Sequence, residues 1–326
     1  MRCLTLATCL RESGHTCYFI CQELPGNLVD FIFAQGFQCF TLKNPFSKSR
    51  LLTSHATLKE FQEVDAEITV KIISKEARYP AFLVVDNYLF DRCWETICQH
   101  KVKSILVIDD LANRPHNCDL LLDQNYYIDA ESRYRGLTHE RCQHLIGPRF
   151  MLLRDEFLKK AERSQKKEGI FVSFGGTDSH DMTFLIVKDL LKSLPKIRIR
   201  AVIGAHYSGK VRDLCRDNYN LEVYQSVSSI AEIMRLCELS IGAGGVTIFE
   251  KQFLGLPSIA YSISDNQRQA LEDLDKGSFI KYLGHYDSFD GDRLTSVTRK
   301  ILRGEIEMKE LDIQNGKKKV ASRLIS

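Results

Sequence analysis

The feature that most constrains the fold is an alternation of short apolar runs with helical stretches, from Gly169 to about residue 303. The runs are rich in β-branched residues and read IFVSF, IRIRAVIG, LEVYQS, LSIGA and SIAYSI. Between the first two, apolar residues recur at helical spacing from Met182 to Leu194. Alternating strands and helices predict a parallel sheet, because parallel strands need crossovers and the crossover helices cover both faces. We therefore expect an α/β domain of the Rossmann-like, doubly wound type.

The first half of the chain shows the same alternation. Its apolar runs are TCYFIC, FQCFTL, AFLVVD, SILVID and DLLLDQ, and helical stretches are expected at residues 27–35, 57–74 and 91–99. A charged stretch without apolar periodicity, KKAERSQKKE, separates the halves. A length of 326 residues suits two domains of about 100 to 200 residues each. We expect an N-terminal domain over residues 1–158, a linker over 159–168 and a C-terminal domain over 169–326.

The amino terminus departs from the usual doubly wound order. Such a domain opens with its central strand and a glycine-rich turn. Here Met1 already lies in an expected helix, on which Leu6 and Leu10 share a face and which Gly14 ends. We therefore expect the N-terminal domain to lack its first strand, with a gap in the middle of its sheet.

Charge and cysteine content argue against several partners. The net charge is +3, from 45 basic and 42 acidic residues, which is too small a surplus to predict a nucleic-acid or anionic-membrane partner. No run of about 18 apolar residues predicts a membrane span. The eleven cysteines are interpreted as reduced thiols of a cytoplasmic protein, and the absence of CxxC and HExxH patterns argues against a metal site. No cofactor is expected.

The strongest local signal is the stretch LSIGAGGVTIFE, where a strand runs into a helix. Gly244 and Gly245 allow the backbone to approach a ligand closely, and the amides that open the helix near Thr247 suit a diphosphate. Glu250 lies one turn into this helix, where an acid often accepts hydrogen bonds from a ribose. Thr247 and Glu250 also fit a capping box that only satisfies helix amides, and spacing alone does not decide between the two interpretations.

Two further loops follow strands of the same domain. Gly175 and Gly176 in SFGGTD suit a diphosphate or a sugar, although Asp178 also fits an ordinary helix cap. After SIAYSI, the residues Asp265, Asn266 and Gln267 supply three consecutive polar groups, of which capping needs one. Because ligands bind at the carboxyl ends of parallel strands, the loops together favour a nucleotide site.

Polar residues also follow the strands of the first half. Asp86, Tyr88 and Asp109, with Asp110, stand at strand ends and are candidate sugar-side residues if both domains face one cleft, although acids at strand ends also act as caps. Arg154, near the domain boundary, is a candidate partner for an anionic ligand. Its alternative partners are Asp155 and Glu156.

These motifs, in this order, resemble a known family: the UDP-2,4-diacetamido-2,4,6-trideoxy-β-L-altropyranose hydrolases of bacterial pseudaminic acid biosynthesis. The similarity covers nearly the whole chain and is carried by the segments MRCLTLA, ELPGNLVDFI, LVVDNY, VIDDLANRPHNCDLLLDQN, LLRDEF, SFGGTD, IGAGGVTIFE and DNQ. It implies the glycosyltransferase B (GT-B) architecture, with UDP mainly on the C-terminal domain. It also implies metal-independent hydrolysis of the anomeric C–O bond, with inversion, to UDP and the free acetamido sugar.

The sequence departs from that family at its start. In the family the catalytic base is a histidine in a GxGHVMRC-like loop, and Met1 aligns with the methionine of that loop. The histidine therefore lies outside this sequence, and no catalytic residue is carried over. We expect either a longer natural chain or a truncated one. Two alternatives stay open: a UDP-sugar-dependent glycosyltransferase on the same architecture, and an inactive UDP-sugar binder.

Overall fold

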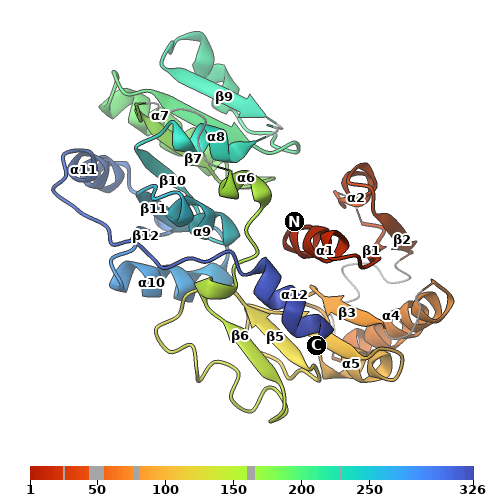
Figure 1. The fold of residues 1–326 in the computed structure, drawn as a ribbon. Helices are drawn as coiled ribbons and strands as arrows, with labels where there is room; N and C mark the ends of the chain where they lie inside the picture. Colours follow the sequence, from red (N-terminus) through yellow and green to blue (C-terminus); the bar gives the residue numbers. More distant parts are fainter. Residues whose placement is uncertain (25, 44–54, 77–80, 160–165, 226, 228) are drawn as a thin grey trace. The chain divides into compact units, whose positions relative to one another are not determined.

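The computed structural model describes residues 1–24, 26–43, 55–76, 81–159, 166–225, 227 and 229–326. The described chain forms two compact units (Figure 1). Unit 1 comprises Met1–Asn125, Asp129–Leu152 and Asn315–Ser326, and unit 2 comprises Tyr126–Ile128 and Leu153–Gln314. The last twelve residues thus belong with the N-terminal part of the chain, which differs from the expected C-terminal domain over 169–326. Most of the linker expected at 159–168 lies outside the described residues.

Unit 2 contains one six-stranded sheet in which every pair of neighbours is parallel. The strand order is β12-β11-β10-β7-β8-β9. The strands are β7 (Ile170–Ser173), β8 (Ile199–Ile203), β9 (Leu221–Gln225), β10 (Leu239–Ala243), β11 (Ser258–Ser262) and β12 (Lys281–His285). The five apolar runs of the second half all form strands, as expected, and the sequence analysis missed β12.

Helices cover both faces of this sheet. They are α6 (Asp155–Leu158), α7 (Met182–Ser193), α8 (Ile230–Arg235), α9 (Val246–Phe253), α10 (Arg268–Lys276) and α11 (Gly291–Leu302), with 3-10 turns η2 (Val211–Arg216), η3 (Asp265–Gln267) and η4 (Tyr286–Ser288). Alternation along β7 divides the core, because successive side chains point to opposite faces. Ile170 and Val172 pack in the cluster that contains Ile186 of α7, whereas Phe171 packs in the cluster with Met234 of α8.

The described residues of unit 1 form two separate parallel sheets rather than one. β1 (Tyr18–Gln22) pairs with β2 (Gln38–Leu42). The second sheet has the order β3-β4-β5-β6, formed by β3 (Phe82–Val85), β4 (Ser104–Ile108), β5 (Leu120–Asp123) and β6 (Gln143–Ile146). The expected strand runs are all present, and the expected interruption of the sheet is confirmed as a break between β1 and β3 among the described residues.

The helices of unit 1 are α1 (Arg2–Glu12), α2 (Val29–Ala34), α4 (His55–Glu76), α5 (Arg92–Gln99) and α12 (Lys317–Ile325), with the 3-10 turn η1 (Pro148–Phe150). Leu106 and Ile108 of β4 pack in a cluster with Leu6 of α1 and Val320 of α12. Ile105 and Val107 of the same strand pack on the opposite face with Trp94 of α5. The carboxyl-terminal helix α12 therefore completes the core of unit 1, beside α1 in Figure 1.

Candidate functional site

The two paired-glycine loops lie next to each other because their strands are neighbours. β7 pairs with β10 in parallel register, with Ser173 opposite Gly242, so both strands end at the same edge of the sheet. Gly175 has φ +89° and Gly245 has φ +94°, backbone conformations that side-chain-bearing residues rarely adopt. A Cβ added at Gly175 or Gly176 would meet no atom within 4 Å, so this loop borders open space.

The helix α9 starts without a capping side chain. Its N-cap residue is Gly245, which has no side chain to cap the helix, and no capping bond to its first amides comes from another side chain among the described residues. Thr247 lies half-buried in its first turn. The capping-box interpretation of Thr247 and Glu250 is therefore wrong, because the Glu250 carboxylate is used elsewhere.

Glu250 instead forms a two-point ion pair with Arg154. The Arg154 Nε and Nη2 atoms donate to the two Glu250 oxygens at 2.8 and 2.9 Å, and Arg154 Nη1 lies 2.7 Å from Glu156. Burial raises the pKa of Glu250, and the bond from Arg154 offsets part of this rise. Each carboxylate oxygen keeps a second lone pair after binding the guanidinium. Arg154 thus holds Glu250 in place at the start of α9.

The polar residues after β11 reach the same edge. Gln267 Oε1 accepts from the Ile263 amide at 3.0 Å, and its Nε2 lies 3.8 Å from where a Cβ on Gly245 would stand. Asn266 Oδ1 accepts from Ser264 Oγ at 2.6 Å. Among the described residues, Gln267 is the N-cap residue of α10 and makes no side-chain capping bond, and neither Asp265 nor Asn266 caps this helix. The loops after β7, β10 and β11 are thereby gathered along one edge.

Asp178 caps a helix, which was the alternative to a ligand contact that the sequence offered for this residue. Its carboxylate accepts from the amides of Met182 and Thr183, at 3.0 and 2.9 Å, which open α7. The residue is buried, at 8% exposure, and adopts φ +41°. Of the three candidates in this loop, Asp178 therefore shapes the turn, while Gly175 and Gly176 form its exposed part.

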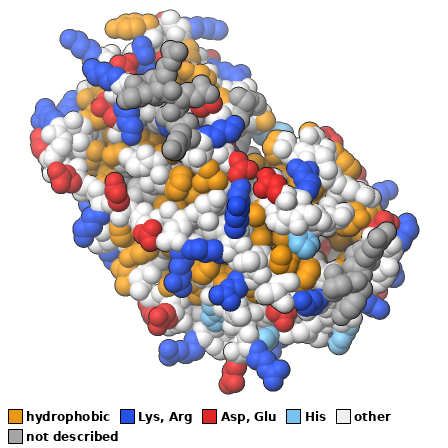
Figure 2. All heavy atoms as spheres, viewed as in Figure 1, with side chains coloured by type: hydrophobic (Ala, Val, Ile, Leu, Met, Phe, Trp, Pro, Cys, Tyr) orange, Lys and Arg blue, Asp and Glu red, His pale blue; other side chains and the backbone are white. Residues whose placement is uncertain are grey.

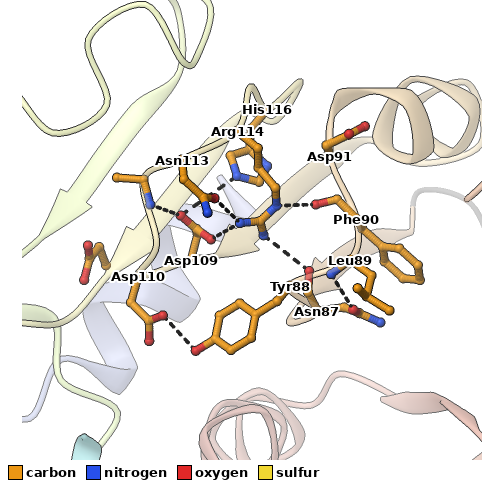
Figure 3. Close-up of polar contacts among 12 residues, drawn as sticks. Asn87, Tyr88, Leu89, Phe90, Asp91, Asp109, Asp110, Asn113, Arg114 and His116 are labelled. Carbon is orange, nitrogen blue, oxygen red and sulfur yellow. Dashed lines mark hydrogen bonds and ion pairs between the residues drawn. The ribbon is translucent and has the colours of Figure 1, made fainter. Parts of the chain in front are cut away.

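The candidate residues of unit 1 divide into an outer and an inner group. In the outer group, Arg2 binds Asp86 through Nε and Nη2 at 2.9 and 2.7 Å and Asp110 at 3.2 Å. Tyr88 donates its hydroxyl to Asp110 at 2.7 Å (Figure 3). Burial would raise the pKa of Asp86, but the hydrogen bonds and charge of Arg2 outweigh it and lower the pKa. Sequence reasoning missed Arg2, which lies 84 residues from Asp86.

Asp109 belongs to the inner group and is fully buried. It accepts from Arg114 Nη1 at 2.7 Å, as Figure 3 shows, and from the Ala112 amide at 2.9 Å. The Tyr134 hydroxyl lies 3.1 Å from Asp109 and 3.0 Å from Asp123. These contacts engage both carboxylate oxygens of Asp109 and hold the loop after β4. The structure thus shows a positioning role for Asp109, and its role beside the sugar stays a prediction.

Two further buried groups adjoin Asp109. Burial raises the pKa of Asp123 to about 6, and the nearby Arg133 charge limits the rise. His116 Nδ1 lies 2.7 Å from Glu95 Oε1, with both side chains fully buried. Sequence reasoning singled out neither Asp123 nor His116, although His116 lies in the stretch LANRPHNCD that follows a strand.

Among the described residues, no cluster of three or more His, Cys, Asp or Glu side chains is placed to hold a metal ion. None of the described helices is long and apolar enough to cross a membrane. On the face that Figure 2 shows, basic and acidic side chains are interspersed. All eleven cysteines are free thiols.

No protein-family model matches the chain. It is 27% identical over 178 residues to the UDP-2,4-diacetamido-2,4,6-trideoxy-beta-L-altropyranose hydrolase of Campylobacter jejuni, covering 53% of this chain and 63% of that protein. It is 22% identical over 192 residues to a Helicobacter pylori protein named as both pseudaminic acid cytidylyltransferase and the same hydrolase, covering 57% and 34%. An uncharacterized protein of Methanocaldococcus jannaschii is 30% identical over 207 residues, covering 60% and 43%. The chain thus spans about a third to two thirds of the length of these relatives.

Solved structures match over nearly the whole chain. The crystal structure of Acinetobacter baumannii MurG has a TM-score of 0.66 at 12% identity, covering 99% of this chain and 95% of that one. LpCGTa in complex with UDP matches with a TM-score of 0.66 at 13% identity and the same coverage. CalG4, the calicheamicin glycosyltransferase, matches with a TM-score of 0.64 at 12% identity, covering 99% and 93%. The chain has the GT-B fold, and over about half of its length it resembles the UDP-2,4-diacetamido-2,4,6-trideoxy-β-L-altropyranose hydrolases.

Proposed function

We propose that the chain binds a UDP-sugar at the carboxyl edge of the unit 2 sheet and hydrolyses UDP-2,4-diacetamido-2,4,6-trideoxy-β-L-altropyranose. The observation that carries the binding site is the adjacency of β7 and β10, each of which ends in paired glycines ahead of a helix. Similarity to two proteins named for this hydrolase activity supports the substrate.

The proposed binding mode follows from the start of α9. Its uncapped amides and the helix dipole favour a diphosphate beside Gly244 and Gly245. Gly175 and Gly176 border the same edge, and Asn266 and Gln267 present amide groups to it. Glu250, held by Arg154, accepts from the ribose hydroxyls with its remaining lone pairs. Asp86 and Tyr88 stay candidates for sugar contacts.

The proposed reaction exchanges one bond for another at the anomeric carbon. A water oxygen forms the new C–O bond, and the old C–O electron pair leaves with the phosphate oxygen of UDP. The helix amides stabilise the charge that develops on this leaving group, without a need for a cation. The proton of the attacking water passes to a base, a role that we assign to no described residue.

Replacing Gly245 tests the binding site. With φ +94° at this position, Gly245→Ala forces the loop to change shape, so UDP affinity is expected to fall about tenfold or more. Gly255→Ala is the control, because Gly255 also has a positive φ of +62° and open surroundings but stands at the other end of α9. Isothermal titration with UDP measures the effect, and thermal unfolding confirms that both variants fold. Equal affinities in the two variants would contradict the proposed site.

Glu250→Gln tests the ribose contact separately. A charge-assisted hydrogen bond contributes about 1.5–3 kcal/mol, so the variant is expected to bind UDP about tenfold more weakly or worse. With 2′,3′-dideoxy-UDP, which lacks the ribose hydroxyls, wild type and variant are expected to bind equally. If the substitution weakens the binding of UDP and of 2′,3′-dideoxy-UDP by the same factor, Glu250 stabilises the loop and does not contact the ribose hydroxyls.

Incubation with the UDP-sugar distinguishes the candidate activities. UDP release in buffer, without an acceptor, supports the hydrolase. Release of UDP that requires an acceptor supports a glycosyltransferase. This is the second candidate function, and the fold that the chain shares with CalG4 favours it. UDP-sugar binding without any release supports a non-catalytic binder and refutes the proposed reaction.

A further inference from the structure

One ionisable side chain of unit 2 lies entirely inside the protein. Lys251, in the second turn of α9, is fully buried, and its Nζ atom has no hydrogen-bond partner among the described residues. Lysines are almost never fully buried unless they are paired, because a buried charge without a partner costs stability. The Phe171 ring centroid lies 5.9 Å from Nζ, at the outer limit of a cation–π contact. Buried ionisable groups of this kind are typical of functional sites.

A glycine on β10 makes room for this amine. A Cβ added at Gly242 would stand 2.9 Å from Lys251 Nζ and 2.1 Å from the Ser173 carbonyl oxygen, so a larger residue would crowd both. Gly242 lies opposite Ser173 in the parallel pairing of β10 with β7. Ser173 is the last residue of β7, and Gly242 is the last but one of β10. The amine therefore lies where the carboxyl ends of two neighbouring strands meet.

The paired-glycine loops start from these two strand ends. Gly175 comes two residues after Ser173, and Gly244 comes two residues after Gly242. Consecutive Cα atoms are about 3.8 Å apart, so Lys251 Nζ lies within about 12 Å of the Gly244 Cα atom. Helical side chains point toward the amino end of their helix, so Lys251 reaches from the second turn toward the amides that open α9. Its amine thus lies beneath the position that we propose for the diphosphate.

Few other charges face this amine. Glu250, its neighbour on α9, supplies the negative charge that acts on it, and that carboxylate is already bound by Arg154, which also pairs with Glu156 of α6. The strands beneath α9 carry no acidic or basic side chain, with the sequences IFVS, LSIGA and SIAYS. Their tyrosine, Tyr261, packs in the cluster on the opposite face of the sheet. Burial lowers the pKa of Lys251 to about 8, and the Glu250 charge offsets only part of this shift.

We propose that Lys251 is a buried counter-charge for the diphosphate of a bound nucleotide, which it attracts through space from beneath the start of α9 without touching it. This inference rests on the proposed UDP site and adds a pH dependence to it. The negative charge of the diphosphate favours the protonated amine, so binding draws a proton from solvent wherever the empty site has lost it. At an effective dielectric constant of about 20, unit charges about 12 Å apart change a binding constant about tenfold.

A neutral side chain of similar length tests this role. UDP titrations of wild type and Lys251→Met are compared at pH 7 and pH 9.5. Wild type is expected to bind UDP about tenfold more tightly than the variant at pH 7, and at most about twofold more tightly at pH 9.5, where the amine has lost its proton. Titration of UDP itself affects both proteins alike. The exposed Lys192→Met is the control and is expected to follow wild type at both pH values.

Proton uptake gives a readout that a purely structural role would not change. Calorimetric titration with UDP at pH 8.5, in two buffers of different ionisation enthalpy, counts the protons that binding takes up. Wild type is expected to take up about half a proton more per UDP than Lys251→Met. Uridine, which has the base and the ribose but no phosphate, is expected to bind both proteins equally and without this difference.

Each contrary result has its own meaning. Equal UDP affinities for wild type and Lys251→Met at both pH values, with equal proton uptake, would overturn the inference and leave the proposed site intact. A loss of affinity for uridine as large as that for UDP would show that Lys251 supports the loop and not the diphosphate. If wild type binds no UDP at either pH, the proposed site is refuted and this inference with it.

Discussion

The two units are built from the same alternation of strands and helices, yet their sheets differ. In unit 2, β7 and β10 have neighbours on both sides, and every residue of β10 is buried. In unit 1, β1 and β3 each have one neighbour among the described residues, and most of their residues are half-buried. The comparison shows how strand pairing affects burial. A strand with neighbours on both sides, such as β10, is covered along both edges, whereas β1 and β3 are each covered along one edge and stay half-buried.

The largest expected difference concerns matched isoleucines. Ile241→Ala in fully buried β10 leaves a cavity and is expected to lower the free energy of unfolding of unit 2 by about 3–4 kcal/mol. Ile20→Ala in half-buried β1 is expected to cost about 1 kcal/mol in unit 1, because less apolar surface is lost. Urea unfolding measures both. Far-UV circular dichroism follows the sheets, and fluorescence of the single tryptophan, Trp94, reports on unit 1. Equal losses of unfolding free energy in the two variants would contradict the expected difference between β10 and β1.

A buried lysine shows that complete burial in unit 2 also has a cost. Lys251 is fully buried, and its Nζ has no hydrogen-bond partner among the described residues. Burial lowers its pKa to about 8, and the Glu250 charge offsets part of this shift. Below pH 8 the buried amine is protonated, and burying this charge lowers the free energy of unfolding. Because Lys251→Met removes the charge, it is expected to stabilise unit 2 by about 3 kcal/mol at pH 7.

The pH dependence of this gain is the sharper test. Between pH 8 and 10.5 the unfolded lysine keeps its proton while the folded one loses it, so wild-type stability rises with pH and the advantage of Lys251→Met disappears. Urea unfolding at pH 7 and pH 10.5 measures this change. The exposed Lys192→Met is the control, and its effect is expected to be small at both values. A gain that stays constant with pH would refute the buried-charge explanation.

In unit 1 the corresponding buried charge is Asp123. Because its pKa is raised from 3.8 to about 6, the folded state binds more protons than the unfolded state between these values. Wild-type stability is therefore expected to fall as pH rises from 4 to 6, by about 2–3 kcal/mol relative to Asp123→Asn. Tryptophan fluorescence during urea unfolding at pH 4, 5 and 6 measures this. The exposed Asp30→Asn should follow the wild-type slope, and a parallel slope for Asp123→Asn would contradict the prediction.

Strands with strong apolar runs were predictable from the sequence, whereas short polar strands were not. IFVSF and SILVID contain β-branched residues that identify β7 and β4. The missed strands are β6, with the sequence QHLI, and β12, with KYLGH. Both lie at the edge of a sheet, where one side is unpaired and polar residues are tolerated. Their identity depends on the neighbouring strand rather than on their own residues.

The loops of the candidate site were predictable from the sequence, but the pairs of side chains that interact there were not. Glycines after strands are visible in the sequence, and their adjacency follows from parallel strand order. The Arg154–Glu250 pair joins residues 96 positions apart, and the spacing of Thr247 and Glu250 favoured a cap equally well. The burial of Asp109, next to the half-buried Asp110, depends on which way each side chain turns at the end of β4. Such facts come from tertiary packing, which local patterns do not record.

The return of α12 to unit 1 affects the order in which the core of unit 1 is assembled during synthesis. Val320 and Leu324, which pack in the same core as Leu6, are translated after the main stretch of unit 2. Unit 2 is nearly continuous, over Leu153–Gln314 with one short earlier segment, and its main stretch emerges before them. Part of the apolar core of unit 1 therefore stays uncovered in the nascent chain until the main stretch of unit 2 has been synthesised.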